Sequence, residues 1–224
     1  MGNAIGQFLT HAVGVAISPL ALIAVILLVA VPRGGRRNAV AFALGWVLAV
    51  AGIFAGLLLL AEAAGAHRHG HPGTWVAWFR LTLGVLLALM TLRQLRLARA
   101  AEVGTLPRRL RNLEQFTTAK CVVLGVVLVV ANPKNVMQIA SGAVTTAESA
   151  LRVPGQLVAG VIFVAISSLG VLVPLAMHLV ARRTSSATLE RWKDWTNLNH
   201  YVITAVLFAL LSVKSLGDGI SGLF

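Results

Sequence analysis

The stretches Ile17-Ser18-Pro19-Leu20 and Ala131-Asn132-Pro133-Lys134 each interrupt an apolar run with a proline, and the two prolines are 114 residues apart. The tryptophan pairs that begin at Trp75 and Trp192 follow them with a similar offset of 117 residues. This spacing indicates two copies of one unit with three hydrophobic segments each. Because three is odd, the second copy would enter the membrane with the opposite orientation. Inverted repeats with interrupted helices near the bilayer midplane are typical of secondary transporters.

The composition predicts an integral membrane protein, since 58% of the residues are hydrophobic and only 12% are charged. Six segments approach or exceed the ~20 residues that a spanning helix needs. They lie at about 4–30, 38–62, 75–95, 118–146, 155–181 and 195–217. The expected fold is therefore an all-α protein with six transmembrane helices in two inverted three-helix repeats, of which the first and fourth helices contain the interrupting prolines. It forms a single transmembrane domain over 1–224. Repeat one covers 1–100, a basic cytoplasmic linker covers 96–117 and repeat two covers 118–224.

The basic residues predict the orientation. They gather in the connections on one side of the expected spans and include Arg33, Arg36, Arg37, Arg93, Arg96 and Arg99. The positive-inside rule places this side in the cytoplasm and both termini outside it. The formal net charge of +12 thus sits beside apolar spans. Anionic membrane lipids are the expected partners of these six arginines, and no nucleic acid is expected because the chain has no separate basic domain.

The two interruptions are the candidate substrate site. A proline inside a helix frees a carbonyl group, which is costly in hydrocarbon unless protein or a wet cavity satisfies it. An ammonium at mid-membrane costs ~2.5–3.5 kcal/mol on insertion scales, so Lys134 is expected to face a cavity or a partner. Ser18 and Asn132 are N-cap types, and a half-helix that begins at a proline attracts anions. The candidate substrate-binding residues are Ser18, Pro19, Asn132, Pro133, Lys134, Asn135 and Gln138.

A simpler interpretation of the same stretches stays open. Both prolines would then be ordinary kinks, and Lys134 would snorkel to the surface. The fourth segment would be either a broken helix or a re-entrant hairpin.

Other polar residues give weaker signals. His11 and Glu62 are candidates for proton coupling, against the alternatives of a packing histidine and an interface carboxylate. Gly52 and Gly56 form a GxxxG pair that predicts close helix packing. Catalytic, metal and nucleotide motifs are absent, and Cys121 is the only cysteine. We therefore expect no enzyme, no metal and no cofactor.

The segment Gly14-Val-Ala-Ile-Ser18-Pro19, the arginine-rich turn after it and Asn132-Pro133-Lys134-Asn135 resemble the lysine exporter (LysE) superfamily. Within it, the chain looks most like the actinobacterial GAP group, which includes the sulfolipid-addressing proteins. Amino-acid exporters of the superfamily usually carry Pro-Gly-Pro where this chain has Ser18-Pro19-Leu20, which fits the lipid-addressing group better. The resemblance implies a multi-pass protein of the bacterial inner membrane that exports an envelope glycolipid or a lipid-linked intermediate.

Three alternative functions are consistent with these sequence features. The first is an exporter or flippase for an anionic or glycosylated envelope lipid, with the lipid or lipid-linked intermediate as partner. The second is a LysE-type exporter of amino acids or ions. The third is a non-transporting accessory of an envelope-lipid export machine, docked through the loop 96–114. A homodimer or an envelope-export complex is the expected assembly.

Overall fold

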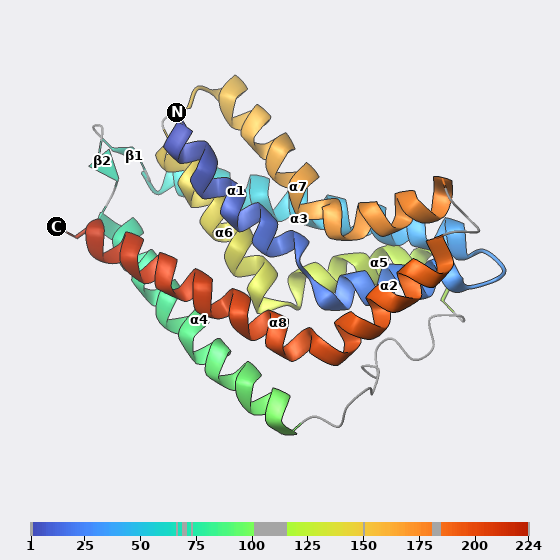
Figure 1. Cartoon of the computed structure of the whole chain (residues 1–224). Coiled ribbons are helices and arrows are strands. Elements are labelled where there is room, and N and C mark those ends of the chain that lie inside the picture. The colour runs from blue at the N-terminus through green and yellow to red at the C-terminus, as the bar shows by residue number, and fades with distance from the viewer. Residues whose placement is uncertain are drawn as a thin grey trace.

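The computed structural model describes residues 2–65, 67–68, 71–72, 74–100, 116–149, 151–180 and 185–223. Almost all of them are helical. The helices are α1 (Gly2–Ala16), α2 (Pro19–Ala30), α3 (Gly35–Ala63), α4 (Thr74–Ala100), α5 (Thr118–Val130), α6 (Pro133–Glu148), α7 (Val153–Val180) and α8 (Ser185–Ser221) (Figure 1). Two short antiparallel strands, β1 (His67–Arg68) and β2 (His71–Pro72), lie between α3 and α4.

Four of these helices are long and apolar enough to cross a membrane by themselves. They are the described segments Gly35–Ala63, Trp75–Arg99, Val153–Val180 and Leu198–Ser221. Two bent pairs, α1 with α2 and α5 with α6, pass the same test when each pair counts as one span. The described residues therefore hold four to six candidate spans, which confirms the prediction of an all-α, multi-pass membrane protein. The six-span inverted repeat itself stays a prediction.

Both helix interruptions fall at the predicted prolines. The axis bends by 46° between α1 and α2 and by 70° between α5 and α6. Each second piece begins with its proline, because that residue lacks the N–H an interior helical position would need. Both angles are below 90°, so the second piece continues away from the first instead of returning beside it (Figure 1). This geometry favours a broken span over a re-entrant hairpin.

Close helix packing occurs at glycines other than the predicted pair. A Cβ at Gly45 of α3 would lie 2.1 Å from the carbonyl oxygen of Val122, and one at Gly125 of α5 would lie 2.3 Å from that of Phe42. These glycines let the backbones of α3 and α5 touch. Gly52 and Gly56 have nothing within 4 Å of a built Cβ. The prediction from their GxxxG spacing was therefore wrong within the described residues, because that face of α3 points away from its neighbours.

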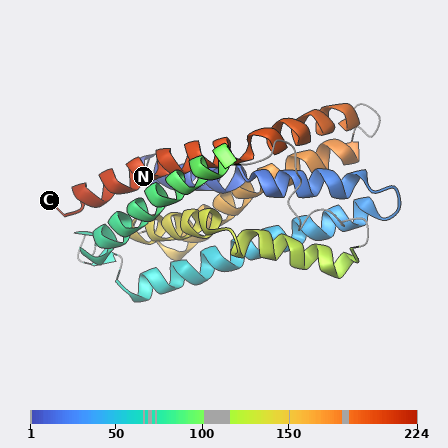
Figure 2. The same cartoon turned by 90° about the horizontal axis from the view of Figure 1, so that it is seen from below.

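The helices α4 and α8 run side by side along one face of the molecule (Figures 1 and 2). Gly84 and Gly219 bring them close, and the hydroxyl of Ser212 donates a 2.8 Å hydrogen bond to the Gly84 carbonyl. The described N- and C-terminal ends lie at one end of the molecule, and the turn between α2 and α3 lies at the other (Figure 2).

Two helices extend beyond the predicted spans. The helix α4 continues to Ala100, so the first residues of the expected linker 96–117 are helical. The helix α8 begins at Ser185 and has 37 residues. Its polar first turns lowered the hydropathy but not the tendency to form a helix, which is why the prediction began only at 195. Residues 101–115, the centre of the linker and of the expected docking loop, lie outside the described part of the chain.

Candidate functional site

The first turn of α6 is built by Asn132 and Pro133. Asn132 has an extended backbone (φ −101°, ψ 104°), and its side-chain oxygen accepts a 3.1 Å hydrogen bond from the backbone N–H of Lys134. The predicted N-cap role of Asn132 is thus confirmed. Ser18 occupies the equivalent position before Pro19 in α2, but its side chain makes no capping hydrogen bond.

The ammonium of Lys134 lies against the end of α1. Its Nζ atom donates to the carbonyl oxygens of Gly14 at 2.7 Å and Ile17 at 2.5 Å, and only 1% of the residue is exposed. The last carbonyls of a helix have no partner within the helix and carry partial negative charge. A lysine from the second interruption therefore satisfies the carbonyls freed at the first. The sequence predicted a partner for this charge, but the fold was needed to identify it.

Two further side chains of α6 make buried hydrogen bonds to neighbouring helices. The Nδ1 atom of His11 lies 2.8 Å from Oε1 of Gln138, and both residues are buried. The Nδ2 atom of Asn135 donates to the carbonyl oxygen of Leu128 at 3.2 Å, which satisfies a group freed where α5 ends. Lys134 and Gln138 thus connect α6 to α1, whereas Asn135 bonds within the second interruption.

Some buried polar atoms of α6 and α7 have no hydrogen-bond partner among the described residues. They are Asn135 Oδ1, Gln138 Nε2, Ser167 Oγ and Ser168 Oγ. The first two belong to α6 and the serines to α7. An unsatisfied buried polar group is costly, so these atoms leave capacity for water or a polar ligand inside the bundle.

The two interruptions line one cavity of about 340 Å³. Pro19 and Leu20 come from the first interruption, and Asn132, Pro133 and Lys134 come from the second. Its other polar lining comes from α4 and α8, through Gln94, His200, Tyr201 and Thr204. The sequence signal for these four was weak, because only their polarity inside otherwise apolar helices could have pointed to them.

Ser18, Asn135 and Gln138 do not line this cavity. Ser18 lines a smaller cavity of about 180 Å³ with Gly170 of α7 and with Trp195 and Thr196 of α8. Pro19 at the first interruption therefore lines both cavities, and α8 contributes residues to each.

The two candidates for proton coupling lie apart. His11 is part of the α1–α6 interface. Glu62 is exposed near the end of α3, where its Oε1 accepts a 2.7 Å hydrogen bond from Gln156. The structure places only His11 beside the interruptions.

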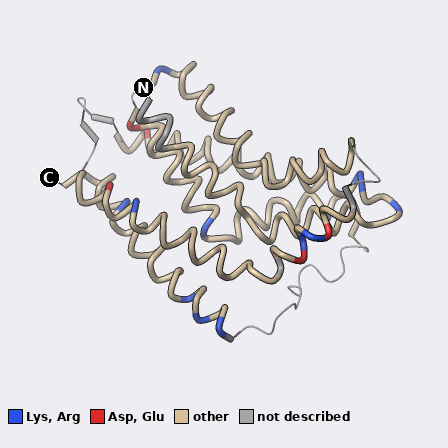
Figure 3. The backbone as a smooth tube through the Cα atoms, viewed as in Figure 1, with Lys and Arg blue, Asp and Glu red and all other residues tan. Residues whose placement is uncertain are grey.

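The six predicted head-group arginines form two groups. Arg33, Arg36 and Arg37 are exposed around the turn from α2 to α3, and Arg93, Arg96 and Arg99 are exposed on the last turns of α4. In Figure 3 both basic segments lie on the side of the molecule away from the N and C labels. Arg36 and Arg37 also line a cavity of about 580 Å³ with His178 of α7.

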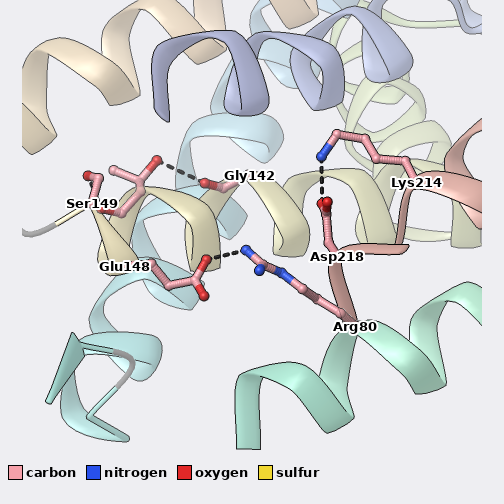
Figure 4. A network of polar contacts seen from close by, with 7 residues as sticks. Arg80, Gly142, Glu148, Ser149, Lys214 and Asp218 are labelled. Carbon is pink, nitrogen blue, oxygen red and sulfur yellow. Dashed lines mark hydrogen bonds and ion pairs between the residues drawn. The ribbon is translucent and has the colours of Figure 1, made fainter. Parts of the chain in front are cut away.

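A charged cluster that sequence analysis missed lies between α4, α6 and α8. Arg80 of α4 pairs with Glu148 of α6, and the side chains are only 18% and 11% exposed. Nearby, Lys214 Nζ contacts Asp218 Oδ2 at 2.7 Å within α8 (Figure 4). The first pair links α4 to α6. The residues that the structure describes contain no group of three or more histidine, cysteine or acidic side chains that could hold a metal ion.

The apolar helices, the two proline interruptions and the cavity between them define a multi-pass membrane protein. The chain belongs to the SfLAP family, because the family model described as Sap, sulfolipid-1-addressing protein, matches residues 8–221. No curated protein and no solved structure was found to match the chain.

Proposed function

We propose that the chain is an exporter or flippase that moves an anionic or glycosylated envelope lipid across the bacterial inner membrane. Membership in the sulfolipid-addressing family links it to an envelope lipid. The observation that carries the proposal is the cavity lined by both helix interruptions and by Lys134. Its head-group site would comprise Pro19, Asn132, Pro133 and Lys134 with the α8 residues Tyr201 and Thr204.

The packing of the helices supports the inverted repeat that such a transporter would use. If α1–α2, α3 and α4 correspond to α5–α6, α7 and α8, the pair α3–α5 corresponds to α7–α1. Likewise α3–α6 corresponds to α7–α2, and α2–α8 corresponds to α6–α4. All six of these pairs are in contact. Alternating access would then come from movement of one repeat against the other.

Lys134 would couple the head-group to this movement. An ammonium has three N–H donors, and two of them are given to the carbonyls of Gly14 and Ile17. A phosphate, sulfate or carboxylate in the cavity would take the third donor and compete for the other two. Weakening the bonds to α1 would loosen the contact between the first interruption and α6.

The position of the basic segments supports an orientation with both termini outside the cytoplasm. Both segments lie away from the termini (Figure 3), and short arginine-rich connections are retained on the cytoplasmic side.

A flipping assay tests the proposal. The purified chain would be reconstituted in liposomes with a fluorescent phosphatidylglycerol, and a membrane-impermeant quencher would report the rate at which probe reaches the outer leaflet. Thr204→Trp fills the cavity and should lower the rate by about tenfold, equivalent to ~1.4 kcal/mol of added barrier. Val206→Trp is the matched control, since Val206 on the same helix is 53% exposed. Equal rates in both variants would contradict the role of the cavity, and an inactive wild-type chain would favour an accessory.

A second candidate is a small-solute exporter of the LysE type. The cavity of about 340 Å³ is small for a glycolipid and lies near the lower end of the ~300–1,000 Å³ typical of small-molecule sites. Exchange of radiolabelled lysine by the same liposomes, without lipid flipping, would favour this function.

A further inference from the structure

A second cavity, here called the basic cavity, lies where α2 ends, α3 begins and α7 ends. It has a volume of about 580 Å³. Its polar side chains are Arg36, Arg37 and His178, and Val29, Val31 and Val40 form part of its apolar wall. It shares no lining residue with the cavity at the interruptions.

The described lining of the basic cavity contains no carboxylate. The ion pairs found among the described residues involve neither Arg36 nor Arg37. A guanidinium presents a planar set of donors that matches the oxygens of phosphate or sulfate. The lining therefore favours an anion of this geometry.

The backbone of the turn fixes the shape of this cavity. Gly34 has φ +82°, which a residue with a side chain rarely adopts, and a Cβ at Gly35 would lie 2.5 Å from the carbonyl oxygen of Leu28. The two glycines thus hold Arg36 and Arg37 close to the end of α2. A rigid turn costs less ordering on binding than a flexible loop would.

The apolar wall distinguishes a lipid from a free anion. An inorganic phosphate would gain nothing from Val29, Val31 and Val40, whereas the first methylene groups of a lipid would be buried against them. The basic cavity also lies beside helices that are apolar enough to span a membrane.

The two cavities lie at opposite ends of α2. Pro19 lines the cavity at the interruptions and Val29 lines the basic cavity. At 1.5 Å per helical residue the distance between them along α2 is about 15 Å, or half the ~30 Å hydrocarbon thickness. This is the distance from a membrane surface to the midplane.

We propose that the basic cavity binds the phosphate or sulfate head-group of an acidic lipid in the leaflet on the arginine-rich side. It would load the transporter before the head-group reaches the interruptions. The loading role rests on the proposed function, but the binding itself does not.

Lipid binding to the purified full-length chain tests this site. Native mass spectrometry would follow titrations with phosphatidylglycerol and with phosphatidylcholine of the same acyl chains. We expect the double variant Arg36→Gln/Arg37→Gln to lose about tenfold in affinity for phosphatidylglycerol, as loss of one charged hydrogen bond would produce, with phosphatidylcholine unchanged. The matched control is Lys120→Gln/Arg191→Gln, which removes the same charge from two exposed positions outside the predicted head-group arginines and should keep affinity within about twofold.

Two results would overturn the proposal. Equal losses in both double variants would mean that only surface charge attracts the lipid. Full competition by millimolar inorganic phosphate, with no preference for the lipid, would mean that the site binds a free anion. Because the readout is binding, it stays informative if the wild-type chain flips no lipid.

Discussion

Each helix interruption contains a proline, but the two differ in bend angle, in helix capping and in hydrogen bonding. Between α1 and α2 the bend is 46°, and Ser18 forms no capping bond. Between α5 and α6 the bend is 70°, and Asn132 caps the new helix. The first interruption offers the carbonyl oxygens of Gly14 and Ile17, and the second supplies Lys134 to bind them.

This difference shows that most side-chain hydrogen bonds around the two interruptions come from α6. Its first two turns provide Lys134, Asn135 and Gln138, and each bonds to a different helix end or side chain. The first interruption mainly supplies backbone carbonyl oxygens, which accept hydrogen bonds. Substitutions at the second interruption should therefore cost more than those at equivalent positions of the first.

The largest effect on stability is expected for Lys134→Ala. It would leave two buried carbonyl groups without their donor, and hydrogen bonds to charged groups contribute ~1.5–3 kcal/mol each. Removal of a buried charge offsets part of this, so we expect the free energy of unfolding to fall by about 2–4 kcal/mol. Thermal unfolding in detergent, followed by tryptophan fluorescence, would measure the change.

The matched control for this substitution is Lys120→Ala, in the exposed first turn of α5. It should change the midpoint little, because exposed charges contribute little to stability. If the two variants unfold at the same temperature, Lys134 does not hold the two interruptions together.

A smaller difference in stability is expected between substitutions at the two N-cap positions. Asn132→Ala removes a capping bond and should cost about 1 kcal/mol, whereas Ser18→Ala removes none and should cost a few tenths at most. The same unfolding measurement would rank them. Equal costs would mean that the two interruptions are equivalent and that the asymmetry seen in the structure does not affect stability.

The sequence predicted the parts of this fold that depend on local chemistry. Pro19 and Pro133 lack the N–H that an interior helical position needs, and each follows a residue of an N-cap type, so both interruptions were predictable. A proline does not always end a helix, since α7 continues through Pro174. The candidate spans were also predictable, because they depend only on the length and apolar composition of each segment.

The rest depends on contacts between distant segments. The partners of Lys134 lie 117 and 120 residues away, and Thr204 lines the cavity only because α8 packs there. Gly52 and Gly45 have similar sequence surroundings, yet only Gly45 meets a neighbouring helix. The face of a helix that is buried follows from the assembled bundle and not from the spacing of its glycines.

The most direct test of the head-group site is native mass spectrometry of the gently purified chain, with Thr204→Trp and Val206→Trp measured beside the wild type. We expect one acidic or glycosylated lipid to remain bound to the wild type and to Val206→Trp, and to be lost from Thr204→Trp because the new side chain fills the cavity at the interruptions. The same bulk phospholipid in all three proteins, at equal occupancy, would contradict a head-group site between the two interruptions.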